Sequence, residues 1–278
     1  MTKRTAWERV QLARHLARPH TLDYIAELLD EPRELHGDRL FRDDPAIVAA
    51  IGRFASEPVV VLGHQKGAST AENVSRNFGM PKPEGYRKAI RILQLAEKFE
   101  LPVITFIDTP AADPGLESEE RGQAWAISSC LQTLLRLRVP TLGIVIGEGG
   151  SGGALALAVC DRLLMLENAI FAVASPEACA AILWREAARA PDAAETMRIT
   201  AEDLYHFGIA DEVIPEPVPA HLDAMGVIRR VGSVLERHLS ELLRLWQERG
   251  PEHLRRLRWA RYRAIGVWSE EAISEPSG

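Results

Sequence analysis

The stretch VIGEGGSGGALALAVCDRLLML, residues 145–166, decides the fold. The β-branched and apolar residues at 141–146 predict a buried strand, and the small apolar residues at 152–159 predict a helix. Five glycines lie between them, within residues 147–153. Because glycine has no Cβ, a ligand can approach its backbone closely, and the unpaired N–H groups of a helix N-terminus favour negative charge. The stretch therefore predicts an anion-binding loop between a buried strand and a helix.

Strands and helices alternate along the middle of the chain. Apolar runs predict strands at 46–54, 58–64, 101–107, 162–166, 169–174 and 209–214, with a polar, irregular segment at 69–79. Apolar residues at helical spacing predict helices at 83–100, 118–138, 176–186 and 200–208. This alternation predicts an α/β protein with parallel strand pairing.

Changes in composition divide the chain into three predicted segments. Residues 1–45 predict an N-terminal helical segment, with a break at Arg18-Pro19 between two short helices. Residues 46–217 form the predicted core, which ends at the proline-rich sequence PEPVP. Residues 218–278 predict charged C-terminal helices that pack on the core or on a partner.

The composition excludes several classes of protein. The chain has 278 residues and a net charge of −6, which gives no sign of a nucleic-acid partner. Its three cysteines form no CxxC pair, and no HExxH motif occurs, so we expect neither a disulfide framework nor a metal site. We find no secretory signal and no apolar run long enough to cross a membrane. The sequence therefore predicts a cytoplasmic protein with no membrane partner.

Two predicted loops, 108–115 and 147–153, follow consecutive strands. If these strands are neighbours, the loops meet at the carboxyl ends, where open α/β sheets bind ligands. Backbone N–H groups from the loops could then converge on one oxygen as an oxyanion hole. Alternatively, the glycines only allow the helix to pack tightly on the strand. The number of glycines and the second loop favour the anion site.

The loop also contains G-x-S-x-G at 149–153, the pattern of a serine nucleophile elbow. A serine hydrolase using Ser151 would need a histidine near the hydroxyl. The candidates lie in helical or linker segments: His206, His221, His238 and His253. The hydrolase remains an alternative function.

Several stretches carry a family resemblance over nearly the whole chain. They are GHQKG (63–67), RNFGMPKPEGYRKA (76–89), PVITFIDTP (102–110), EERGQ (119–123), VIGEGGSGGALAL (145–157), ASPEACAAILW (174–184) and DEVIPEP (211–217). Together they resemble the carboxyltransferase α subunit of bacterial acetyl-CoA carboxylase. The resemblance implies a crotonase/ClpP-like superhelix of repeated ββα units with flanking N- and C-terminal helices.

The resemblance also implies a reaction and its partners. The family moves a carboxyl group from carboxybiotin, held on a biotin carboxyl carrier protein, to acetyl-CoA, giving malonyl-CoA for fatty acid or polyketide precursors. A zinc-ribbon β-type subunit would hold the acyl-CoA and the zinc, usually in a heterotetramer of two α and two β subunits. By resemblance, Gly152 and Gly153 supply a backbone oxyanion hole for biotin. The implied substrate-binding residues are Gly149, Gly150, Ser151, Pro110, Ala111 and Ala112.

Two departures from the family pattern lie in the first loop. The family usually reads DTPGAYPG, whereas this chain reads DTPAADPG, with Ala111 for glycine and Asp113 for an aromatic residue. Alanine would cost about 1 kcal/mol if the turn needs a positive φ. Asp113 would bring negative charge near an anion pocket. A non-catalytic paralogue, or one with another acyl acceptor, is therefore a further alternative.

Overall fold

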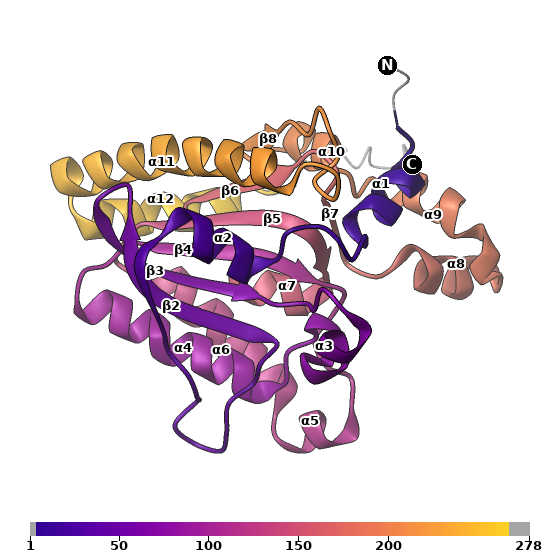
Figure 1. Cartoon of the computed structure of the whole chain (residues 1–278), viewed down its shortest axis with the longest axis horizontal. Coiled ribbons are helices and arrows are strands. Elements are labelled where there is room, and N and C mark those ends of the chain that lie inside the picture. The colour runs from indigo at the N-terminus through magenta and orange to yellow at the C-terminus, as the bar shows by residue number, and fades with distance from the viewer. Residues whose placement is uncertain (1–3, 267–278) are drawn as a thin grey trace, which may run out of the picture.

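One mixed sheet forms the centre of the computed structural model, which describes residues 4–266 (Figure 1). Its strands are β1 Asp30–Glu34, β2 Ile47–Phe54, β3 Glu57–His64, β4 Val103–Thr109, β5 Thr141–Gly150, β6 Arg162–Leu166, β7 Ile170–Ala172 and β8 Glu212–Ile214. Their order is β1-β2-β3-β4-β5-β6-β8, and β7 pairs with the end of β5. The first two pairings are antiparallel and the others are parallel, which confirms the predicted α/β class.

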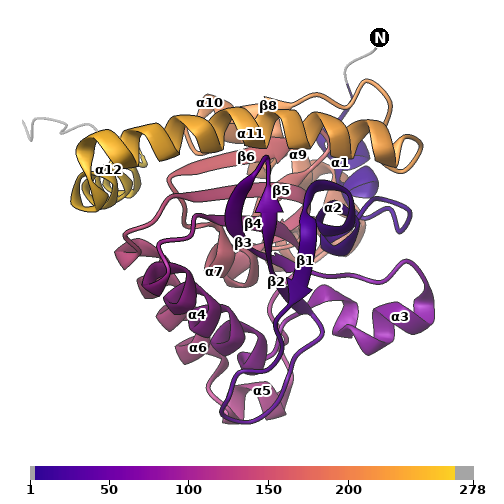
Figure 2. The ribbon, with the colours of Figure 1, turned by 60° about the vertical axis from the view of Figure 1, so that its left-hand side comes forward.

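Helices cover both faces of the sheet (Figure 2). The helices are α1 Ala6–Ala13, α2 Thr21–Leu28, α3 Thr70–Ser75, α4 Pro83–Lys98, α5 Leu116–Glu120, α6 Gln123–Arg136, α7 Ser151–Ala158, α8 Pro176–Trp184, α9 Ala190–Met197, α10 Ala201–His206, α11 Ala224–Arg249 and α12 Pro251–Arg263. Helices α4 and α7 pack on one face with α6 against them, and α2 and α11 cover the other. The central strands are therefore buried on both faces, and every residue of β4 is buried.

The predicted glycine loop is wrong in one respect, because residues 147–150 are strand. β5 continues to Gly150, and α7 begins at the next residue. The reason is a second partner for the end of this strand: β7 pairs with Glu148, Gly149 and Gly150 along its free edge. The anion-binding turn is thereby reduced to a direct strand-to-helix junction.

The single helix predicted at 118–138 is also wrong. α5 ends at Glu120, and α6 begins at Gln123 after Gly122, whose φ is +82°. This left-handed conformation, which glycine adopts at little cost, turns the chain between the two helices. In the segment predicted to be irregular, Ser69 instead caps the short helix α3, because its side chain accepts a hydrogen bond from Glu72 N–H.

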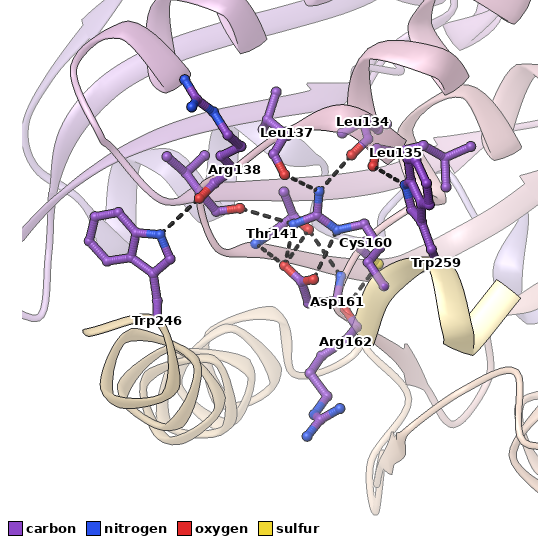
Figure 3. A network of polar contacts seen from close by, with 12 residues as sticks. Leu134, Leu135, Leu137, Arg138, Thr141, Cys160, Asp161, Arg162, Trp246 and Trp259 are labelled. Atoms are coloured by element: carbon purple, nitrogen blue, oxygen red, sulfur yellow. Dashed lines mark hydrogen bonds and ion pairs between the residues drawn. The ribbon is translucent and has the colours of Figure 1, made fainter. Parts of the chain in front are cut away.

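The terminal segments pack on the same sheet. α1 and α2 lie on either side of the predicted break at Arg18-Pro19, and β1 adds a strand to this N-terminal segment. At the other end, α11 and α12 are anchored by two tryptophans: Trp246 Nε1 donates to the Arg138 carbonyl and Trp259 Nε1 to that of Leu135 (Figure 3). The predicted 209–214 strand is shorter, since β8 begins at Glu212.

Candidate active site

The ends of β4 and β5 bring the two predicted loops into contact. Thr109 pairs with Gly149, so the chain after each strand emerges at the same edge of the sheet. A Cβ built on Gly150 would lie 1.9 Å from the Pro110 carbonyl oxygen, and one on Gly153 would lie 2.4 Å from Ala112 N. Neither position can accept a side chain unless the first loop moves. The predicted meeting of the loops is confirmed, and the glycines permit it.

An open groove of about 590 Å³ lies beside the start of α7. Ser151 and Gly152 line one part of it, and the rest is mainly apolar: Leu155, Phe171, Met197, Ile199, Leu204 and Phe207. A Cβ on Gly152 would meet only Ile127 Cγ2, at 3.8 Å. The first N–H groups of a helix have no intrahelical acceptor, so the start of α7 can offer donors to a ligand in the groove.

The remaining predicted site residues surround the same junction. Pro110, Gly149 and Gly150 line a smaller cavity of about 30 Å³ on the side of β7 that faces Arg14. Ala111 and Ala112 are half-buried. Gly153 is buried beneath this loop, while Gly152 is partly exposed at the groove. The structure thus brings all eight predicted residues together, with Gly152 the more accessible of the two proposed donors.

The pairing of β4 with β5 is interrupted just before the junction. It is regular as far as Ile107 and Val145 and resumes only at Thr109 and Gly149, so β5 bulges. The Asp108 side chain fills the gap, and its Oδ1 accepts a hydrogen bond of 2.9 Å from Glu148 N–H. A Cβ on Gly147 would lie 2.3 Å from that oxygen. Asp108 therefore satisfies a backbone N–H of β5 that the interrupted pairing leaves without a strand partner.

Buried charges surround this bulge. Lys66 Nζ lies 2.8 Å from Asp108 Oδ1 and 2.9 Å from Glu148 Oε1. Glu148 Oε2 lies 2.7 Å from Arg14 Nε, and the same guanidinium pairs with Glu177 of α8 at 2.6 Å. His20 Nδ1 lies 3.3 Å from Asp108 Oδ2. One ionic network therefore links α1, the end of β3, β4, β5 and α8.

The electrostatics keep Asp108 and Lys66 ionised at neutral pH. Burial alone would raise the pKa of Asp108, but the charge of Lys66 and the contact with His20 hold it well below its usual range. Burial would also lower the pKa of Lys66, and the two carboxylates raise it instead. Asp108 is therefore held as an anion and Lys66 as a cation, so neither is poised to exchange protons with a substrate.

The side chains of His64 and Tyr86 both contact the backbone of the first turn of α7. His64 Nε2 lies 3.2 Å from the Gly153 carbonyl oxygen, and Tyr86 Oη donates to the same oxygen at 3.3 Å. Burial lowers the pKa of His64 to about 4, so the ring is neutral at pH 7. Both side chains fix the first turn of the helix and neither lines the groove.

The serine hydrolase alternative lacks its base. Ser151 is exposed and has a φ of +53°, as a strained elbow residue would. Within residues 4–266, however, no hydrogen bond joins its hydroxyl to a histidine. His221 stacks on His15, and His238 pairs with Glu212. The histidine that this alternative needs beside Ser151 is therefore not in place.

The two departures from the family pattern leave the groove intact. Ala111 is not among the residues of positive φ within residues 4–266, so the expected strain does not arise. The Asp113 carboxylate accepts hydrogen bonds from Asn77 Nδ2 and Ser118 Oγ. The backbone N–H of Asp113 donates to the Pro81 carbonyl. These contacts hold the pKa of Asp113 below its usual value despite partial burial, which alone would raise it. Asp113 thus anchors the loop and does not line either cavity.

Sequence reasoning missed the ionic network and the apolar groove. The sequence signals that could have indicated the ionic network were charged residues near the predicted strand ends, namely Lys66 inside GHQKG and Glu148 among the glycines. The groove residues at 197–209 come from α9, α10 and the segments that follow each of them, and they gave no local signal. Within the described residues, no helix is both long and apolar enough to span a membrane. Across the same residues, no group of three or more His, Cys, Asp or Glu side chains is placed to hold a metal ion.

Comparison with known proteins decides the family. The family model described as "Acetyl co-enzyme A carboxylase carboxyltransferase-like" matches residues 1–266. The chain belongs to this family. It is 52% identical over 267 residues to the acetyl-coenzyme A carboxylase carboxyl transferase subunit alpha of Thermus thermophilus, covering 96% of this chain and 83% of that protein. It is 57% identical over 238 residues to the subunit of that name from Syntrophomonas wolfei, covering 85% and 75%.

Solved structures share the fold of this carboxyltransferase family member at low sequence identity. A Pseudomonas malonate decarboxylase hetero-tetramer in complex with coenzyme A matches with a TM-score of 0.66 at 17% identity, covering 82% of this chain and 88% of that one. Transcarboxylase 12S matches with a TM-score of 0.65 at 20% identity, covering 84% and 44%. The predicted crotonase-like fold is thereby confirmed.

Proposed function

We propose that this chain is the α subunit of a biotin-dependent carboxyltransferase that converts acetyl-CoA to malonyl-CoA, for fatty acid or polyketide precursors. The observation that carries the proposal is the start of α7 at Gly152, where backbone donors meet an apolar groove in a member of the acetyl-CoA carboxylase carboxyltransferase family. The alternatives, a serine hydrolase and a non-catalytic paralogue, have no comparable support in the geometry.

The residues around the groove fit biotin. Its bicyclic ring is mostly apolar with one polar ureido edge, which matches a groove of apolar side chains with N–H donors at one end. When bound, carboxybiotin would supply the carboxyl group that is transferred. The Gly152 and Gly153 N–H groups would stabilise negative charge at the ureido oxygen, with Gly153 placed one layer deeper. Gly149, Gly150, Ser151, Pro110, Ala111 and Ala112 would form the adjoining walls.

The chain's own ionisable groups leave the proton transfer to the substrates. Asp108 and Glu148 are held in ion pairs, and His64 is buried and neutral at pH 7. None of them touches the groove. The side chains therefore orient the backbone, and backbone N–H groups act on the reacting charge.

An exposed apolar surface adjoins the site. Large apolar side chains are exposed just after β7 and on α7 and α8, including Val173, Leu155, Ile182 and Leu183. We propose that a zinc-ribbon β-type subunit covers this surface and brings the acyl-CoA, in a heterotetramer of two α and two β subunits. A biotin carboxyl carrier protein would deliver carboxybiotin. We place the complex in the cytoplasm, where unpaired thiols such as Cys130 and Cys160 persist.

The direct test is malonyl-CoA-dependent carboxylation of free biotin by the complex with a β-type partner. We expect turnover well above that of the partner alone. Ser151→Ala serves as the control, because it should leave transfer largely intact if the amides act and abolish activity if Ser151 is a nucleophile. No turnover above the partner alone would contradict the proposal and favour the non-catalytic paralogue.

A further inference from the structure

We propose that Lys66 is a positioning residue for the start of α7, acting through Asp108 and Glu148. The expected effect of Lys66 on turnover rests on the proposed function of the Gly152 and Gly153 amides. Its expected effect on the order of the backbone does not rest on that function. Lys66 lies beside the interruption in the pairing of β5 with β4.

Side chains replace the missing sheet hydrogen bonds at the bulge of β5. The Ile146 carbonyl accepts from Arg18, at 3.2 Å from Nε and 2.9 Å from Nη2, and Glu148 N–H donates to Asp108. Arg18 is itself paired with the buried Glu216 at 2.8 Å. The path of β5 into the glycines thus depends on how firmly these side chains are held.

Lys66 is the cation that joins the two carboxylates at this point. Asp108 Oδ1 is shared between Glu148 N–H and Lys66 Nζ, so the ammonium fixes the acceptor. The Lys66 stem is itself confined, because a Cβ on Gly79 would lie 2.7 Å from Lys66 Cγ. Without the Lys66 ammonium, the nearby carboxylates of Asp108 and Glu148 would repel each other in a buried environment.

The backbone after Glu148 cannot correct a displacement. Gly149 and Gly150 are strand residues paired with β4 and β7, and Ser151 begins the helix directly, so no loop lies between strand and helix to absorb a shift. A shift at Glu148 would therefore pass directly to the Gly152 amide. A misplacement of about 1 Å can cost on the order of 100-fold in rate.

Lys66→Met tests this in the complex with the β-type partner. We expect kcat for biotin carboxylation to fall about 10- to 100-fold, with KM for malonyl-CoA within about two-fold, because the change affects charge stabilisation and not CoA binding. Lys66→Arg keeps a cation there and should recover most of kcat. A purely structural role predicts that kcat of the folded complex is unchanged in both variants.

A charge-balanced variant guards against simple misfolding. Lys66→Met/Glu148→Gln removes one cation and one carboxylate, Arg14 keeps its pairing with Glu177, and Asp108 keeps its contact with His20. This variant should fold and still show the loss of kcat. Wild-type kcat in the folded double variant would overturn the proposal.

Hydrogen exchange of the full chain separates this proposal from the proposed function. In Lys66→Met, amides of residues 146–154 should exchange at least about ten-fold faster, while residues 134–142 keep their protection. Arg258→Lys is the matched control at the other end of β5 and should give the opposite pattern. Unchanged exchange at 146–154 would overturn the positioning role, whatever the activity. A wild-type complex that fails to carboxylate biotin would contradict the proposed function and leave the exchange test valid.

Discussion

The two ends of β5 are both held by buried ion pairs, but the pairs hold different kinds of backbone. At the first end, Asp161 Oδ2 accepts from Thr141 N–H and Oγ1, each at 2.8 Å, and pairs with Arg258 (Figure 3). Arg258 also donates to three carbonyls, those of Leu134, Leu137 and Val139. This end continues into regular pairing with β4 and β6.

At the other end of β5, the ion pairs lie at the interruption in its pairing with β4. There, Arg18 and Asp108 replace sheet hydrogen bonds of β5. Lys66 pairs with the Asp108 and Glu148 carboxylates, beside residues that line the groove or the smaller cavity. Similar buried ion pairs can therefore serve stability at one end of a strand and placement of the backbone at the other.

The largest expected contrast is between alanine substitutions at Gly150 and Gly143. Gly150→Ala would drive a Cβ into the Pro110 carbonyl and displace the first loop, so kcat for biotin carboxylation should fall about 100-fold or more. Gly143→Ala would crowd Cys160 Sγ at 2.9 Å, away from the groove, and should cost about 1–3 kcal/mol of stability with kcat nearly unchanged. Steady-state kinetics with urea unfolding measures both, and equal losses of kcat would erase the contrast.

Next in size is the loss of Arg258. Arg258→Met leaves Asp161 buried without its cation and should lower the free energy of unfolding by about 3–5 kcal/mol. Since Arg258 touches neither cavity, kcat of the folded complex should stay within about two-fold. Urea unfolding and kinetics at a temperature where the variant is folded provide the check. A ten-fold drop in kcat would place this end of β5 in the active machinery.

Lowering the pH should destabilise the end of β5 beside the groove before it destabilises the opposite end. The folded chain holds the pKa of His64 at about 4, below its ordinary value of 6.5, so the unfolded state binds more protons between these values. Stability is therefore fully present above pH 6.5 and falls as the pH drops toward 4, by up to about 3 kcal/mol. At the opposite end of β5, the side chains that contact Asp161 are those of Thr141 and Arg258, and neither is a histidine.

Hydrogen exchange between pH 7 and 4.5, corrected for the intrinsic rate, measures this order of opening. Residues 146–154 should lose protection before residues 134–142, and His64→Gln should flatten the dependence of unfolding free energy on pH. Simultaneous loss at both ends would contradict the assignment of the pH effect to His64.

The smallest effect is expected at Trp246. Trp246→Phe removes one hydrogen bond, to the Arg138 carbonyl, and should cost about 0.5–1.5 kcal/mol with no change in kcat. Thermal unfolding of the variant beside Trp259→Phe, which loses the matching bond to Leu135, measures it. A change in kcat in either variant would show that the C-terminal helices act on the groove.

The sequence alone predicted the features that depend on local patterns. Glycines at 147–153 and prolines in the first loop indicated two segments meeting at the carboxyl ends of parallel strands, and Thr109 and Gly149 do pair. The parallel core and both terminal pairs of helices were also predictable from periodicity. These signals lie within single elements or between consecutive ones.

The ionic network was beyond sequence reasoning for a physical reason. Arg14, Lys66, Asp108, Glu148 and Glu177 come from five elements or their ends, and each would be an ordinary exposed residue in isolation. Only the register break between β4 and β5 creates the gap that Asp108 fills. The continuation of β5 to Gly150 likewise needed β7 as a second pairing partner.

The amide of Gly152 is tested most directly by a matched pair of substitutions. Gly152→Ala keeps the N–H and finds open space, with Ile127 Cγ2 at 3.8 Å, whereas Gly152→Pro removes the N–H at a helix position that needs no intrahelical bond. In the complex with a β-type partner, biotin carboxylation by the alanine variant should stay within a few-fold of wild type, and the proline variant should lose about 100- to 1000-fold in kcat. Equal activity of the two folded variants would contradict the role of this backbone donor.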